Sequence, residues 1–203
     1  PLKAPEYSKK KAMEYFARAG YREMGTDGVL KNERGERLVV ELTFADSSTL
    51  MTNVCSILRQ EALKCGVDLR LDSLTYSVCS RKVFEKRYQA ALWAWPLQTP
   101  FPRLYETFSS ELAYDARGNP VGNTNNIMAV SDAGLDAALD AERNAPDIGS
   151  LKLALHRAQQ RLYELCVWIP GWREPYTHVA CWRWIRWPES PTRFCSPRIY
   201  NPL

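Results

Sequence analysis

The sequence predicts a layered α/β domain with at least one parallel crossover. Residues 38–44 and 67–74 alternate between apolar and polar side chains, as strands do. Residues 50–65 carry apolar side chains at spacings of three and four, as a helix does. Strand, helix, strand, helix and strand are expected in turn between residues 38 and 95, and this order builds a sheet with helices packed on it.

The first helix is expected over residues 7–19, where Gly20 ends it. A β-hairpin is expected next, over residues 28–44. Its turn is centred on Arg34 and Gly35, and the apolar residues of its second strand alternate. The chain would thus enter the α/β layers through a hairpin.

The long helix over residues 50–65 follows N-capping side chains at residues 46–49, and Gly66 closes it. After the next strand, a short helix is expected over residues 77–87 and a third strand over residues 88–95. This third strand is expected to be buried.

The second half of the chain is expected to begin with a surface loop over the turn-rich residues 114–126. Helices follow over residues 132–143 and 151–165, and strands are expected within residues 167–184. Residues 185–203 are rich in proline and are expected to form an extended tail. The side chains expected to face inward on the two helices are Leu135, Ala138, Leu139, Leu151, Leu155, Ala158, Leu162 and Leu165.

The composition is globular and excludes several classes of protein. Apolar residues make up 45% and charged residues 25% of the chain. No apolar run approaches the roughly 20 residues of a membrane-spanning helix. The net charge of +4 is too balanced to indicate nucleic acid by itself. Tryptophan and arginine interleave over residues 182–187, which favours a strand with two different faces, and the alternative is a surface that stacks on bases.

No group of residues predicts catalysis or a metal site. The six cysteines lack metal-site spacing, and only His156 and His178 could assist them. Cys55 and Cys65 are about 15 Å apart in one expected helix, beyond disulfide reach, so any bridge would join different elements. No nucleophile is paired with a base in a known motif, and no pair of carboxylates is marked for acid/base work. We therefore expect a binding protein without a cofactor, not an enzyme.

The expected ligand site follows the third strand. Open α/β sheets bind ligands beyond the carboxyl ends of their strands, and an apolar, aromatic segment, residues 96–102, lies there. Two tryptophans at the end of the strand share a face by alternation, and the alternative is that both are core residues. The expected wall residues are Trp93, Trp95, Gln98, Thr99 and Phe101.

Seven segments occur in a recognisable order, the last of them containing Trp168-Ile169-Pro170-Gly171-Trp172. Together they resemble the C-terminal part of the extracellular solute-binding proteins, family 5, of dipeptide and oligopeptide ABC importers. The Trp-Ile-Pro-x-Trp stretch is most similar to the branch linked with microcin C and oligopeptide uptake. The segments are residues 16–21, 27–38, 63–69, 84–95, 108–110, 125–139 and 167–172.

This resemblance implies that residues 1–203 form the second, C-terminal lobe of a periplasmic-binding-protein-like fold (type II), with a mixed β-sheet flanked by helices. It implies a monomer that closes on a peptide or peptide-like ligand and delivers it to the permease subunits of an ABC importer, without a role for nucleic acid. It implies export to the periplasm or cell surface, with the signal peptide and first lobe outside this chain. A lone lobe cannot enclose a ligand, so we expect weak or no binding from it.

One position departs from the family pattern. Many members carry an aspartate three residues after the tryptophan that matches Trp95, and this aspartate pairs with the free amino terminus of the peptide. Here the position is Gln98, which is neutral. A carboxylate makes a stronger hydrogen bond to an ammonium group than an amide does. We therefore expect a ligand that is not gripped by a free α-amine, such as a blocked or modified peptide or a different oligomer.

Three other functions stay open. The same lobe could be the ligand-sensing domain of a regulator, which a DNA-binding domain in the full reading frame would reveal. Residues 182–198 could bind nucleic acid, with an affinity that falls steeply with salt. A hydrolase ranks last, because no nucleophile is paired with a base.

Overall fold

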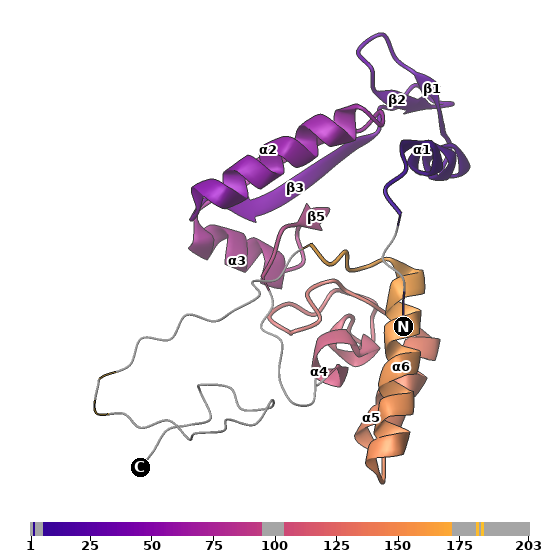
Figure 1. Ribbon diagram of the computed structural model, residues 1–203, viewed down its shortest axis with the longest axis vertical. Helices are drawn as coiled ribbons and strands as arrows, with labels where there is room; N and C mark the ends of the chain where they lie inside the picture. Colours follow the sequence, from indigo (N-terminus) through magenta and orange to yellow (C-terminus); the bar gives the residue numbers. More distant parts are fainter. Residues whose placement is uncertain (1, 3–5, 95–103, 172–181, 183, 185–203) are drawn as a thin grey trace. The chain divides into compact units, whose positions relative to one another are not determined.

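The computed structural model describes residues 2, 6–94, 104–171, 182 and 184 (Figure 1). The chain divides into two compact units. Unit 1 comprises Pro1–Ala94 and Asp115–Ile127, and unit 2 comprises Trp95–Tyr114 and Met128–Leu203. Unit 1 contains helices, a three-stranded parallel sheet and a two-stranded antiparallel sheet, which confirms the α/β class.

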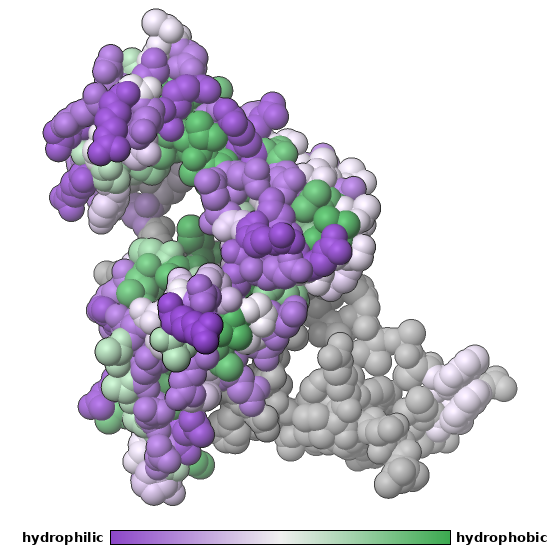
Figure 2. All heavy atoms as spheres, turned by 180° about the vertical axis from the view of Figure 1, so that it is seen from behind, coloured by the Kyte–Doolittle hydropathy of each residue, from purple (hydrophilic) through white to green (hydrophobic). Residues whose placement is uncertain are grey.

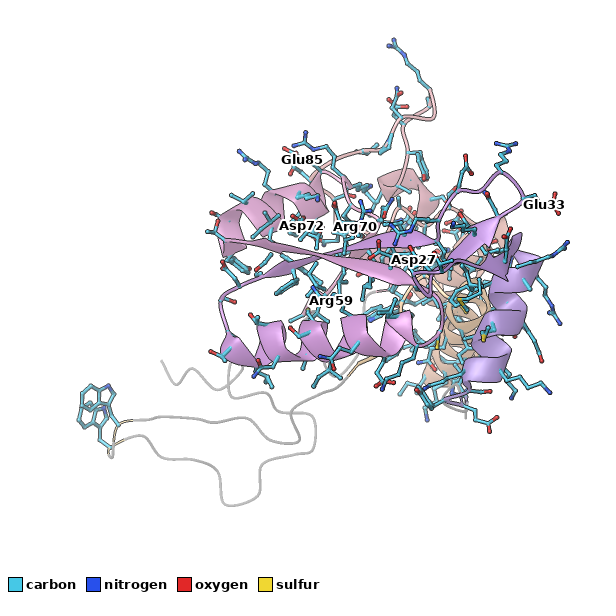
Figure 3. The ribbon with its side chains drawn as sticks, turned by 90° about the horizontal axis from the view of Figure 1, so that it is seen from above. Asp27, Glu33, Arg59, Arg70, Asp72 and Glu85 are labelled. Carbon is cyan, nitrogen blue, oxygen red and sulfur yellow. The ribbon has the colours of Figure 1, made fainter. Side chains whose placement is uncertain are left out.

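The main sheet of unit 1 contains three parallel strands in the order β4-β3-β5. These are β3 (Val39–Ala45), β4 (Asp68–Leu74) and the short β5 (Ala90–Ala91). Helix α2 (Thr49–Leu63) leads from β3 to β4, and α3 (Tyr76–Phe84) leads from β4 to β5. The two crossovers run in opposite directions across the sheet, so right-handed connections place the helices on opposite faces. Figure 3 shows the strands between these two helices.

The face of the sheet under α2 is apolar. Leu42 and Phe44 of β3 and Cys55 of α2 are buried there. The strands alternate, so the neighbouring residues of β4 and β5 with the same orientation complete this layer. Its partly buried members are Met51, Leu69, Leu71, Ala90 and Leu92.

The opposite face of the sheet is more polar and lies under α3. Cys79 and Val83 of α3 are fully buried against it. β3 presents Glu41 and Thr43 to this side, and β4 presents Asp72. Figure 3 shows α3 on one side of the sheet and Arg59 of α2 on the other.

The rest of unit 1 contains α1 (Lys9–Arg18) and a two-stranded antiparallel sheet. Ser8 caps α1 by accepting a hydrogen bond from the backbone of Lys11 at 3.3 Å. The small sheet pairs β1 (Tyr21–Met24) with β2 (Leu30–Asn32).

The expected hairpin over residues 28–44 is present around its turn, between residues 30 and 38, but not over its full length. Its turn is present, because Gly35 has φ of 78° and the Asn32 side chain accepts hydrogen bonds from the backbone beyond it. Farther from the turn the two strand segments separate. β2 pairs with β1, which was not expected, and β3 pairs with β4. The two sides of the turn are joined by the bridge between Lys31 and Arg37. The Asn32 N–H donates to the Glu36 carbonyl at 3.0 Å, and the Leu38 N–H donates to the Leu30 carbonyl at 2.7 Å.

Unit 2 is helical in the part that the structure describes. It contains α4 (Tyr105–Phe108), the 3-10 helix η1 (Ser110–Leu112), α5 (Ala133–Arg143) and α6 (Ile148–Leu165). The two long helices were expected within a few residues of these bounds, whereas α4 and η1 were not. The buried core of the unit consists of Phe108, Val130, Leu135, Ala138, Leu139 and Ala158.

An ion pair and a helix cap meet at the beginning of α5. The Asp132 carboxylate accepts a hydrogen bond from the backbone of Leu135 at 2.8 Å. It also pairs with the Arg161 guanidinium of α6, with Nη2 2.8 Å from Oδ2. Arg161 lowers the pKa of Asp132 to about 2. One carboxylate thus begins α5 and fixes it to α6.

The strands expected within residues 167–184 are not present where the structure describes this stretch, at residues 167–171, 182 and 184; the other residues lie outside the description. The rings of Trp182 and Trp184 stack with centroids 4.9 Å apart.

The surface of the described residues is mostly polar. Figure 2 shows hydrophobic side chains as separate patches among hydrophilic ones on the face seen from behind. Within the described ranges, no helix is long and apolar enough to span a bilayer.

Candidate functional site

The three strands of the main sheet end at one edge. Ala45, the last residue of β3, is in register with Leu74, the last residue of β4, and the backbone of Asp46 donates to the Leu74 carbonyl at 2.9 Å. On the other side of β3, the backbone of Leu92 donates to the Thr43 carbonyl at 2.9 Å. Trp93 follows directly. It therefore lies at the carboxyl edge, where open α/β sheets bind ligands.

Trp93 packs between the two ends of α3. Its ring stacks on that of Tyr76, with centroids 6.1 Å apart and an interplanar angle of 14°. The Phe84 ring meets it edge-on at 6.0 Å and 86°. Both are favourable aromatic geometries. Trp93 is only partly buried, so it contributes to packing and also reaches the edge.

Of the five expected wall residues, the structure describes Trp93 alone. The other four lie outside the described residues, and their role stays a prediction. They are Trp95, Gln98, Thr99 and Phe101. The third strand, expected over residues 88–95, is assigned only to Ala90–Ala91, and Trp93 and Ala94 continue beyond it without strand pairing.

Tyr76 is an edge residue that the sequence did not indicate. It is the first residue of α3 and follows the end of β4 after a single residue, Thr75. The expected helix began one residue later, at Ser77, and an exposed tyrosine outside an apolar period carries no clear sequence signal. Its place at the edge depends on the order of the strands, in which β4 and β5 lie on either side of β3.

A polar cluster fixes α3 to the sheet. Lys82 Nζ lies 2.6 Å from Glu41 Oε1 and 2.7 Å from Asp72 Oδ2. The Thr43 hydroxyl donates to Asp72 Oδ2 at 2.9 Å. The hydrogen bond from Lys82 lowers the pKa of Asp72, and the two carboxylates raise the pKa of Lys82. The ion pair between Lys82 and Asp72 therefore stays charged at neutral pH and holds α3 on β4.

An open hollow of about 480 Å³ lies beside this cluster, towards the amino ends of the strands. Its arginines are already paired, Arg70 with Asp68 at 3.4 Å and Arg87 with Glu85. Figure 3 shows Arg70 and Asp72 along β4. The hollow is remote along the strands from the edge that carries Trp93. It is lined by Val39, Glu41, Arg70, Arg87, Tyr88 and Gln89.

The described residues form no group of three or more side chains suited to a metal ion. The described cysteines, Cys55, Cys65, Cys79 and Cys166, are free. Burial raises the thiol pKa of Cys55 and Cys79, which keeps both in the unreactive protonated form. His156 is exposed on α6, and His178 lies outside the described residues.

No protein-family model matches the chain. In sequence, the chain is 23% identical over 107 residues to the oligopeptide-binding protein AppA of Bacillus subtilis. The match covers 52% of this chain and 19% of AppA. This sequence relationship agrees with the resemblance noted from the ordered segments.

Solved structures share the fold. AppA of Bacillus subtilis, solved with a nonapeptide, superposes with a TM-score of 0.69 at 19% identity, covering 81% of this chain and 31% of AppA. The oligopeptide-binding protein of Thermus thermophilus, with a pentapeptide, gives 0.68 at 18% identity, covering 82% of this chain and 29% of that protein. The periplasmic oligopeptide-binding protein of Thermotoga maritima, with mannohexaose, gives 0.70 at 14% identity, covering 81% and 30%.

The chain spans about a third of the length of these solved structures. All three are described as oligopeptide-binding proteins, and none as an enzyme. The chain is thus related in sequence to AppA and has the fold of a segment of the periplasmic oligopeptide-binding proteins.

Proposed function

We propose that the chain is one lobe of the solute-binding component of an ABC importer, which captures peptides or peptide-like oligomers by closing two lobes on them. The observation that carries this proposal is the parallel sheet whose strands end together at an edge bearing Trp93 and Tyr76. Ligands bind at such edges, and a fold neighbour, AppA, was solved with a nonapeptide.

The proposal extends to the organisation of the whole protein. Residues 1–203 are the second lobe, with residues 185–203 as its tail, and a first lobe completes the site. The remaining two thirds of the length of the solved neighbours is ample for another domain. Because the neighbour from Thermotoga maritima is described as periplasmic, we place the protein in the periplasm or at the cell surface, as a monomer that delivers its ligand to permease subunits.

The ligand wall is completed by the segment after Trp93. We assign it the residues that follow the edge in sequence, among which Gln98 stands where related proteins often have an aspartate. A neutral amide grips an ammonium group less strongly than a carboxylate does. The preferred ligand therefore has no free α-amine. The wall consists of Trp93, Trp95, Gln98, Thr99 and Phe101.

Titration calorimetry on the full-length gene product tests both parts. The probes are one pentapeptide with a free amino terminus and the same peptide after N-acetylation. We expect the acetylated form to bind at least as tightly as the free form. A Gln98→Asp variant should reverse the order, because it restores a charge-assisted hydrogen bond. A strict requirement for the free amine would refute the role of Gln98, and a failure to bind peptides of any kind would refute the proposed function.

A further inference from the structure

We infer that Tyr76 is a ligand-contacting residue whose ring receives a flat apolar side chain of a bound peptide, such as that of phenylalanine. The inference rests on the proposed function and adds to it a contact residue and a ligand feature. It follows from the position of Tyr76, from its exposure and from the support behind its ring.

The position of Tyr76 is fixed by the sheet. β4 ends at Leu74, in register with the end of β3, and α3 begins at Tyr76. Only Thr75 separates the strand from the helix. Tyr76 therefore projects from the carboxyl edge, where the ligand of an open α/β sheet lies.

The Tyr76 ring is both exposed and supported. It is 62% exposed, although it stacks almost parallel to Trp93 at 6.1 Å. The Phe84 ring braces Trp93 edge-on from the other end of α3. Tyr76 is thus the outer member of an aromatic stack, with one ring face against Trp93. Aromatic side chains held in this way provide contact area at a low entropic cost, as binding anchors do.

The chain around Tyr76 favours an apolar contact over an ionic one. Residues 73–78 contain no charged side chain, and the neighbours of Tyr76 in the sequence are Thr75 and Ser77. One carboxylate residue, Asp46, does lie at this edge, because its backbone bonds to the Leu74 carbonyl. A lysine-bearing peptide is therefore the competing ligand that an experiment must include.

Binding of three peptide sets to the full-length gene product tests this inference. All peptides are N-acetylated, in keeping with the proposed ligand, and the sets are tetra-alanine, tetra-alanine with phenylalanine at each position in turn, and the same series with lysine. Tyr76→Ala should weaken at least one phenylalanine peptide by about 2- to 12-fold, the range expected for one aromatic pair, while tetra-alanine changes less than about 2-fold. Tyr76→Phe should retain the preference. Tyr15→Ala is the matched control, because Tyr15 is 65% exposed on α1 and lies outside the edge.

The outcomes separate the two proposals. If the wild-type protein binds none of the peptides, the proposed function and this inference both fall. If it binds them and Tyr76→Ala weakens no phenylalanine peptide, or weakens all peptides equally, only the inference falls. If Tyr76→Ala weakens the binding of the lysine peptides as much as that of the phenylalanine peptides, the inferred preference for an apolar side chain is wrong.

A second test uses the wild-type protein alone, so its result does not depend on whether a variant folds. Tetranitromethane nitrates exposed tyrosine rings, and mass spectrometry quantifies each site. Tyr76 and Tyr15 are exposed to a similar degree, 62% and 65%, so they should react similarly in the free protein. The tightest phenylalanine peptide should protect Tyr76 and leave Tyr15 unchanged. Unaltered nitration of Tyr76 at saturating peptide would overturn the inference.

Discussion

Replacing Lys82 with methionine tests how α3, and with it Tyr76, is held on the sheet. The Lys82 ammonium contacts Glu41 at 2.6 Å and Asp72 at 2.7 Å, and the side chains of Lys82 and Asp72 are each 25% exposed. Methionine retains the apolar stem and removes the charge. The two carboxylates then share one site beneath the helix without a cation.

The cost follows from this geometry. A hydrogen-bonded charge that loses its partner in a partly buried site destabilises a protein by about 1–3 kcal/mol. The matched control is Lys64→Met. It removes the ion pair between Lys64, whose side chain is 54% exposed, and Glu61, whose side chain is 39% exposed. Such exposed pairs contribute about 1 kcal/mol or less to stability. We expect Lys82→Met to lower the free energy of unfolding by more than Lys64→Met does.

Urea denaturation followed by circular dichroism measures this difference at neutral and acidic pH. Lys82 lowers the pKa of Asp72 in the folded state, so the stabilisation is present above the ordinary value of 3.8 and is lost as the pH falls through the folded pKa. The difference in unfolding free energy between the wild type and Lys82→Met should therefore become smaller at acidic pH. Equal destabilisation by the two lysine variants at pH 7, or a gap that does not change in acid, would refute the role of the cluster.

Three further changes test the two units. Asp132→Ala should destabilise unit 2 by about 1–2 kcal/mol, because it removes the cap of α5 and the partner of Arg161. In the wild type this contribution should fade in urea titrations as the pH falls from 3.8 towards the Asp132 pKa of about 2, and a pH-independent difference would contradict it. Gly66→Ala should lower the melting temperature, since φ is 84° and a Cβ would lie 2.5 Å from Leu30 Cγ. An unchanged temperature would contradict the close approach of the turn after α2 to Leu30 of β2. Phe108→Ala should cost about 3–5 kcal/mol in unfolding free energy, because the ring is 1% exposed in the core of unit 2, and a cost below about 1 kcal/mol would contradict that core.

The helices were predictable because their signals are local. Asp132 accepts a hydrogen bond from residue 135, within the same turn, and buried Leu135 and Leu139 recur at helical spacing. A capping side chain and an apolar period can both be seen in about 15 consecutive residues. The expected helices of units 1 and 2 therefore agree with the structure to within a few residues.

The partners of the strands were not predictable in the same way. The alternation of Leu42 and Phe44 correctly indicates a strand, but it carries no information on which strand lies beside it. β3 pairs with β4, although the whole of α2 separates these two strands in the sequence. The Gly35 turn suggested instead a partner that is adjacent in the sequence.

The arrangement of the residues at the candidate site was predictable only in part, for the same reason, and their contact with a ligand stays a prediction. The carboxyl edge and Trp93 followed from the order of elements. The contact between Tyr76 and Trp93 depends on β4 and β5 flanking β3, which the sequence does not display.

Small-angle X-ray scattering of the full-length gene product, with and without saturating peptide, tests the two-lobe proposal most directly. Closure of two lobes on a ligand makes the protein more compact. We predict a smaller radius of gyration with the peptide that calorimetry shows to bind, and no change with a peptide that does not bind. An unchanged radius of gyration at saturation would contradict capture by lobe closure.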